Sequence, residues 1–316
     1  MSTPPASQRR KGGYGGKPSG FPLFRRAARP EPEASAAPTV AQRFPAPAKL
    51  NLMLRVIGRR PDGYHLLQTV FRFVDYGDEI AIAVRDDGVV SRERDLPGIP
   101  AASDLTLRAA RLLKDRAGTA AGAHLDLCKR LPLGGGVGGG SSDAATVLLA
   151  LNHLWGTGLT RAELQALALE LGADVPVFIF GRSAFGEGIG ERLSPIDLPP
   201  AWYLVLTPPV QVATTRIFSD PELKRDSKPI NIQGFSVASA TNDLEALVCR
   251  LYPAVARNLE WLKAHGPAMM TGSGACVFAW FETEAAARGV LSQLPPDMSG
   301  FVARGVDCHP LSGLAR

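Results

Sequence analysis

The chain has 316 residues, of which 45% are hydrophobic and 21% are charged, values that are ordinary for a globular protein with room for two domains. Residues 1–43 contain eight basic and only two acidic residues, a net charge of +6. Because the whole chain has a formal net charge of +5, residues 44–316 have a net charge of −1. A near-neutral body without a basic stripe predicts no nucleic-acid binding, and no apolar run is long enough to predict a membrane span.

The first 43 residues differ in composition from the rest. They hold seven prolines and five glycines and show no apolar periodicity, so we expect a disordered basic tail. An expression tag, a targeting peptide and a natural extension would all have this composition, and no secretory signal is evident. Elsewhere the cysteines are widely spaced and lack a Cys-x-x-Cys pair, which predicts buried thiols in a reducing cytoplasm without zinc or disulfides: Cys128, Cys249, Cys276 and Cys308.

Hydrophobic periodicity predicts that order begins at Phe44. The expected elements are, in chain order, strands at 50–57, 67–74 and 79–84, a helix at 104–115, a strand at 123–128, and helices at 141–155 and from Thr160 onward. The pattern restarts after residue 196, where we expect a strand at 203–206, helices at 242–250 and 254–264, a strand at 275–281, a helix at 284–294 and a strand at 301–306. Strands and helices mix without strict βαβ alternation, which predicts an α+β fold with domains at 44–196 and 197–316.

Residues 131–145, LPLGGGVGGGSSDAA, contain the most informative motif. Six glycines within seven residues lose backbone entropy on folding, but they let bare N–H groups approach a ligand closely. The helix that begins near Ser141 adds the positive end of its dipole, so the segment predicts a phosphate-binding loop. Ser141 and Ser142 could cap this helix or bind phosphate oxygens or a cation.

Three other interpretations of this loop fit less well. A Walker loop requires lysine where Gly140 stands. A dinucleotide-binding fingerprint requires a strand and an acidic residue where the capped helix at Thr160 is expected. A flexible linker would not lie between an apolar strand and a capped apolar helix.

Two polar motifs flank the loop. Lys49 and Asn51 are two positions apart in a predicted strand and therefore lie on the same face, where a solvated strand face is the alternative explanation. Asp174 follows a helix that Gly172 is expected to end, and the residues alone leave open whether its carboxylate is structural or functional. Near the far end, the glycine turn at 271–275 is weak by itself, because many hairpins contain one.

Taken together, these motifs resemble the GHMP kinase superfamily. The resemblance rests on PAKLNL at 47–52, RPDGYH at 60–65, FVDYGD at 73–78, the glycine loop, GADVP at 172–176 and TGSGA at 271–275. It spans residues 44–310 and is strongest for the family that acts on 4-diphosphocytidyl-2-C-methyl-D-erythritol. This resemblance implies a ribosomal-protein-S5-like N-terminal domain and a ferredoxin-like C-terminal domain.

The resemblance also implies a reaction and a set of site residues. An ATP-dependent kinase of this family phosphorylates the 2-hydroxyl of its small-molecule substrate in non-mevalonate isoprenoid (terpenoid) biosynthesis, and Mg²⁺ is expected with ATP. Asp174 would take the hydroxyl proton beside Lys49. The positions matched to ATP binding are Leu133, Gly134, Gly135, Gly136, Val137, Gly138, Gly139, Gly140, Ser141, Ser142, Lys129 and Asp104. The positions matched to substrate binding are Asn51, Tyr64, His65, Thr214, Phe218, Gly272 and Ser273.

Two positions depart from the family pattern. Asp143 follows the two serines where asparagine is expected, and a carboxylate there would oppose a bare phosphate unless Mg²⁺ lies between them. Asp104 also replaces an asparagine near the adenine and loses an amide donor. No dedicated acidic metal ligand can be assigned. A GHMP kinase for another alcohol and a non-catalytic sugar- or nucleotide-sensing relative remain the alternatives, although Asp174 and Lys49 together argue against the second.

Overall fold

The computed structural model describes residues 40–237 and 240–315, which belong to one compact unit. The tail expected at residues 1–43 therefore lies outside the described residues up to position 39. Order begins slightly before Phe44, because the first strand, β1, starts at Gln42.

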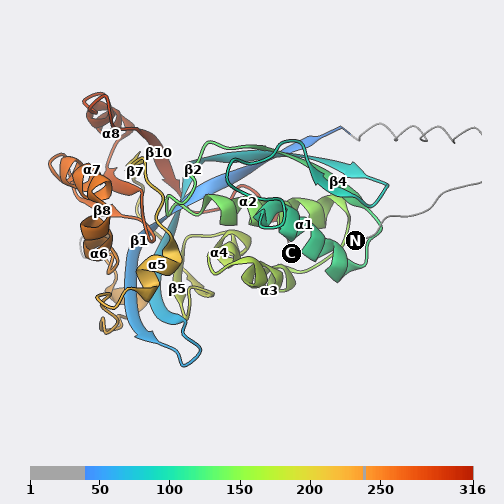
Figure 1. The fold of residues 1–316 in the computed structure, drawn as a ribbon, viewed down its shortest axis with the longest axis horizontal. Coiled ribbons are helices and arrows are strands. Elements are labelled where there is room, and N and C mark those ends of the chain that lie inside the picture. The colour runs from blue at the N-terminus through green and yellow to red at the C-terminus, as the bar shows by residue number, and fades with distance from the viewer. Residues whose placement is uncertain (1–39, 238–239, 316) are drawn as a thin grey trace, which may run out of the picture. The chain divides into compact units, whose positions relative to one another are not determined.

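Two long strands form the backbone of the fold (Figure 1). β1 (Gln42–Arg59) and β2 (His65–Arg85) pair as an antiparallel hairpin along most of their length. The two strands expected at 67–74 and 79–84 are in fact continuous in β2. The polar stretch between them resembles a turn in sequence, but Gly77 instead lets the strands approach closely, because a Cβ there would lie 2.6 Å from the Cα of Pro47.

The first half of the described chain is a sheet covered by helices. β2 also pairs with β4 and β5; helices α1 and α2 pack against the sheet, and α3 and α4 pack mainly against these helices and each other in the same hydrophobic core. Their bounds are β3 Val90–Arg92, α1 Leu105–Ala117, β4 Gly122–Cys128, α2 Gly139–Leu154, α3 Arg161–Leu171, α4 Val175–Phe180, β5 Ala184–Glu187 and β6 Arg192–Pro195. α2 is buried along almost its whole length, so the glycine loop is joined directly to the core.

The second half is a smaller antiparallel sheet with its own helices. Its strand order is β10-β7-β9-β8, and β10 joins it to β2. The bounds are β7 Trp202–Leu206, α5 Thr214–Ser219, η1 Ile232–Gly234, α6 Glu245–Leu251, α7 Pro253–Lys263, β8 Ala268–Met270, β9 Val277–Phe281, α8 Glu284–Leu291, β10 Gly300–Val306 and η3 Ser312–Leu314. The last described residues return to the first core, where the ring of His309 packs edge-on against both Phe73 and Phe178, whose rings also contact each other.

The helices with clear caps are confirmed. Asp104 caps α1 by accepting from the amide of Thr106, and Thr160 forms the expected capping box with Glu163 at the start of α3. The sequence interpretation missed α4, α5, β3, β5, β6 and β8, each of which is six residues or shorter. No helix among the described residues is long and apolar enough to cross a membrane.

Candidate active site

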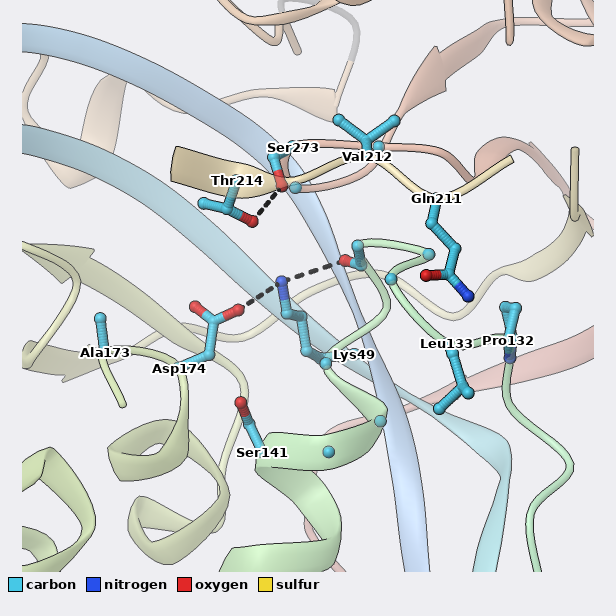
Figure 2. A pocket seen from close by; sticks show the side chains of 18 of the residues that line it. Lys49, Pro132, Leu133, Ser141, Ala173, Asp174, Gln211, Val212, Thr214 and Ser273 are labelled. Carbon is cyan, nitrogen blue, oxygen red and sulfur yellow. Dashed lines mark hydrogen bonds and ion pairs between the residues drawn. The ribbon is translucent and has the colours of Figure 1, made fainter. Parts of the chain in front are cut away.

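A cleft of about 610 Å³ lies where the glycine loop meets the loop at 272–274 (Figure 2). β1 contributes Lys49 and Asn51, the segment before α4 contributes Asp174, and the first turn of α2 contributes Ser141. Motifs that are more than 200 residues apart in the sequence thus line one cavity. We treat this cleft as the candidate active site.

Lys49 is the central cation of the cleft. Its side chain is only 2% exposed, and its Nζ lies 3.0 Å from Oδ2 of Asp174. The same ammonium donates to Oδ1 of Asn51 at 2.5 Å and to the carbonyl of Gly136 at 3.2 Å. Three acceptors therefore satisfy the three N–H bonds of the ammonium and fix it in one position. The pairing of Lys49 with Asp174 agrees with the interpretation from the motifs.

Asp174 presents its carboxylate to the cleft. Gly172 ends α3, and Asp174 occupies the cap position of α4 without making a capping hydrogen bond. Its side chain is 41% exposed and points toward Lys49 (Figure 2). A carboxylate that is free on one side and paired with a buried ammonium on the other is suited to accept a proton from a bound alcohol.

The glycine loop is shaped both by its neighbours and by the space it leaves for a ligand. Gly134, Gly136 and Gly138 have positive φ values of 67°, 73° and 72°. A Cβ on Gly136 would lie 2.4 Å from the carbonyl oxygen of Thr271, and one on Gly138 would lie 3.0 Å from the Lys49 side chain. Several of these glycines are therefore required by the protein itself, before any ligand binds.

Helix α2 directs its N-terminus into the cleft. Gly138 is its cap residue and makes no side-chain capping bond, so the amides of the first turn remain available to a ligand. Ser141 lines the cleft and points into it (Figure 2). Ser142 does not line it: this residue is fully buried, and its Oγ has no partner among the described residues. Free amides and the helix dipole make this end an anion site.

A second polar network holds the base of the cleft. Asn51 donates from Nδ2 to Oγ1 of Thr69 at 2.8 Å, and its backbone amide donates to Oγ1 of Thr271 at 2.9 Å. These bonds orient Asn51 so that its Oδ1 faces Lys49. Thr214 and Ser273 lie nearby and share a hydrogen bond of 2.7 Å. Thr69 and Thr271 were not among the predicted site residues, because neither lies in the part of a motif that suggests a ligand.

One end of the cleft opens into a smaller cavity of about 290 Å³. The two cavities share Leu105, Lys129, Leu133 and Gly140 among their lining residues. Asp104 also lines the smaller cavity, but its carboxylate is engaged as the cap of α1 and accepts from Arg92 at 2.6 Å. Although burial opposes the shift, hydrogen bonds from Thr106 and Arg92 lower the pKa of Asp104. Its carboxylate thus has protein partners before any adenine is bound.

Asp143 lies beneath the loop rather than facing the phosphate site. It is 2% exposed, and its Oδ2 accepts from Lys129 at 2.9 Å, while Lys129 also pairs with Asp78. Burial and the charge of Asp78 raise the pKa of Asp143 to about 7, against the opposing effect of Lys129. The expected repulsion between Asp143 and a phosphate is therefore relieved within the protein. Lys129 is accordingly held in an internal ion pair.

The other end of the cleft opens into a cavity of about 440 Å³ with aromatic walls. Phe218 and Thr214 line both cavities, so the two cavities adjoin. The rings of His65 and Phe218 have centroids 5.0 Å apart, and Tyr64 is 60% exposed at the rim. The predicted aromatic residues are therefore brought together at one end, with Asp174 in the cavity between them and the smaller one.

Most of the other predicted residues line the central cleft, but Val137 does not. The cleft is lined by Leu133, by the six loop glycines and by Gly272 and Ser273. Val137 is 1% exposed and packs in a core cluster, and only its carbonyl approaches the site, by accepting from the amide of Lys49. Gln211 and Val212 also line the cleft and were missed, because the short segment that carries them contains no recognisable motif.

Comparison with known proteins decides between the GHMP families. Sequence profiles described as GHMP kinases N terminal domain and GHMP kinases C terminal match residues 104–182 and 231–298. The 4-diphosphocytidyl-2-C-methyl-D-erythritol kinase of Thiobacillus denitrificans is 61% identical over 272 residues, which cover 86% of this chain and 98% of the relative. The kinase of the same name from Nitrosospira multiformis is 59% identical, covering 86% and 93%.

The chain belongs to the 4-diphosphocytidyl-2-C-methyl-D-erythritol kinase family. A crystal structure titled 4-(cytidine 5'-diphospho)-2C-methyl-D-erythritol kinase has a TM-score of 0.73 and 35% identity, and the match covers 84% of this chain and 99% of that one. A mevalonate kinase structure, at 14% identity and a TM-score of 0.60, shares the fold alone. The expected GHMP kinase fold is thus confirmed, and the chain is a kinase. The domain boundary at 196/197 stays a prediction.

Proposed function

We propose that the three joined cavities hold ATP and 4-diphosphocytidyl-2-C-methyl-D-erythritol end to end, and that the chain transfers the γ-phosphoryl group to the 2-hydroxyl in the cavity between them. The observation that carries this proposal is the position of the Lys49–Asp174 pair in the central cleft, between the cavity of Lys129 and that of Tyr64. Family membership supplies the kinase activity and the use of ATP.

Asp174 and Lys49 divide the chemistry of the alcohol between them. Asp174 accepts the hydroxyl proton on the carboxylate side that faces the cleft, and Lys49 stabilises negative charge on the reacting oxygen. Phosphoryl transfer depends mainly on positioning and charge neutralisation, and the amides at the start of α2 supply both for the phosphates. The buried position of Lys49 strengthens its field, because little water screens it.

The aromatic end suits the cytidine part of the substrate. A pyrimidine is flat, so it stacks between aromatic rings, and its polar edge needs hydrogen-bond partners. Tyr64 and Phe218 supply the rings and His65 supplies a polar edge. Thr214, Ser273 and Asn51 line the stretch between this end and Asp174, where hydroxyl groups of the substrate would lie.

Mg²⁺ is compatible with the oxygen groups of the cleft. No cluster of three or more metal-ligating side chains occurs among the described residues, so a metal would enter with the nucleotide. The Asp174 carboxylate and the Ser141 hydroxyl both face the cleft and are ligand types that Mg²⁺ accepts beside phosphate oxygens (Figure 2). When bound, the ion would neutralise phosphate charge.

A coupled ADP-release assay tests this function. We expect turnover with 4-diphosphocytidyl-2-C-methyl-D-erythritol and a kcat/KM at least about a hundredfold lower with mevalonate or homoserine, because those alcohols leave the polar and aromatic groups of the third cavity unpaired. Equal turnover of the three alcohols would contradict the placement of the cytidine part. Phosphorylation of another hydroxyl, detected by NMR of the product, would contradict the placement of Asp174.

A further inference from the structure

Arg225 lies behind the aromatic cavity, where its guanidinium contacts the side chain of one lining residue, His65, and the backbone of another, Phe218. Its Nε donates to Nε2 of His65 at 2.9 Å. Its other N–H groups donate to three backbone carbonyls of the preceding segment, that of Phe218 in α5 and those of Asp220 and Leu223 beyond the helix, at 3.0, 2.7 and 2.9 Å. Arg225 does not line the cavity itself. Four hydrogen bonds hold Arg225 in place, and the one to His65 is made to a side chain that lines the cavity.

The direction of this hydrogen bond determines where His65 carries its proton. An arginine Nε–H can only donate, so the imidazole Nε2 must accept and must be unprotonated. A neutral imidazole then has its proton on Nδ1. His65 is 8% exposed and lines the cavity, and its Nδ1 has no hydrogen-bond partner among the described residues. The cavity thus receives one fixed N–H donor.

The surroundings of His65 favour the neutral ring. Burial, followed by the positive charges of Arg225 and Arg59, lowers the pKa of His65 below its ordinary value. Asp62 also lines this cavity, but it is paired with Arg60 at 2.7 Å. A doubly protonated imidazole would in addition point an N–H at the N–H of Arg225. Geometry and charge therefore select the same form of the ring.

The proposed function places the imidazole of His65 at the polar edge of the cytosine. We propose that Arg225 is a positioning residue that fixes His65 as the Nδ1–H tautomer, so that the ring nitrogen N3 of cytosine meets a hydrogen-bond donor. Cytosine N3 is an unprotonated acceptor, whereas uracil carries a hydrogen there. With uracil, two donors would face each other and both would lose their hydrogen bonds to water. The inference rests on the proposed function and adds the residue that sets its base specificity.

The first test measures the tautomer directly in the wild-type protein. Two-dimensional ¹H–¹⁵N spectra of the side chains show which ring nitrogen carries the proton, and loss of one signal set in H65Q assigns His65 among the five histidines. We expect the proton on Nδ1 and unprotonated Nε2. A proton on Nε2 would overturn the proposal, whatever any variant does.

The second test compares R225M with wild type on the cytidine substrate and its uridine counterpart. R225M removes the donor and keeps most of the side-chain stem, so His65 is free to adopt either tautomer. We expect KM for the cytidine substrate to rise about tenfold, roughly the effect of one lost hydrogen bond, with kcat and the KM for ATP changed less than about twofold. The preference for cytidine over uridine should fall by about the same factor.

Two variants separate this role from a merely structural one. R225K keeps a hydrogen-bond donor and should retain most of the preference for cytidine over uridine. R59M removes the other nearby cation, Arg59, which donates to the carbonyl of Gly63 rather than to His65. R59M should retain the wild-type tautomer and preference. If Arg225 only held its loop, R225M would weaken both substrates equally, and an unchanged preference would overturn the inference. Absence of wild-type activity on the cytidine substrate would instead refute the proposed function.

Discussion

Replacing Asp174 with asparagine separates its chemical role from its structural one. The substitution keeps the shape of the side chain and removes its ability to take a proton. A positioned general base contributes about 10²- to 10⁴-fold to a rate, so we expect kcat to fall by that factor. This corresponds to about 3–5 kcal/mol in the activation barrier.

The structure predicts a much smaller effect of the same substitution on folding. Asp174 lies 3.0 Å from Nζ of Lys49, but its side chain is 41% exposed, so water screens the attraction. Lys49 also keeps Asn51 and Gly136 as acceptors, and the asparagine oxygen can replace the lost carboxylate oxygen. We therefore expect the free energy of unfolding to change by about 1 kcal/mol or less.

Asp126→Asn is a matched control for this comparison. Asp126 pairs with Arg94 at 2.9 Å and is 39% exposed, but it lies on β4 and lines none of the three joined cavities. The Asp126→Asn variant should lose about as much stability as Asp174→Asn and keep the wild-type kcat. ADP release measures kcat, calorimetry measures ATP affinity, and urea unfolding measures stability. Full turnover by Asp174→Asn, or a loss of activity shared equally by both variants, would refute the role assigned to Asp174.

Three further substitutions test the two ends of the cleft and its floor. Gly140 is the second residue of α2, and a Cβ there would lie 3.7 Å from Cδ1 of Leu105 in α1. Gly140→Ala should therefore raise stability by at most about 0.5–1 kcal/mol while KM for ATP increases; unchanged KM would place the phosphates elsewhere. Phe218→Ala should raise KM for the cytidine substrate about tenfold or more through lost stacking, with KM for ATP as the internal control. The pKa of Asp143 is raised from 3.8 to about 7. Between these pH values the folded state holds a proton that the unfolded state has lost, so the free energy of unfolding of the wild type falls as pH rises from about 4 to about 7. Asp143→Asn should lack this slope in urea unfolding at pH 5 and 8, and parallel pH dependences in the two proteins would contradict the assigned proton.

Local signals in the sequence predicted the helices well and the short elements poorly. The capping box at Thr160 marked the start of α3, because a capping side chain acts within three residues of its own position. The helix α1 was predicted from its apolar spacing, and the structure adds Asp104 as its cap. α4 has only six residues, VPVFIF, which is too short for a helical period to emerge from its apolar run. The continuity of β2 depends on contact with β1 at Gly77, and that contact is not visible in the local sequence.

The site was predicted in its parts rather than in its geometry. Lys49 and Asp174 lie on different elements, and their contact followed from the family resemblance, since spacing alone does not reveal it. The two serines differ in their surroundings. Ser141 lines the cleft, whereas Ser142, about 100° further around the helix, is fully buried. Arg225 carried no signal at all, because it acts through a histidine 160 residues away.

Asp143 shows how a departure from a family pattern can be absorbed by the fold. Its carboxyl group lies with Asp78 around the ammonium of Lys129, and its raised pKa allows it to hold a proton near neutral pH. In that state one carboxylate and one ammonium cancel, so this cluster adds little net charge beneath the phosphates. Lys129 then remains paired with Asp78, as Lys49 is with Asp174. We therefore expect the free amides at the start of α2 to supply a large part of the attraction for the triphosphate.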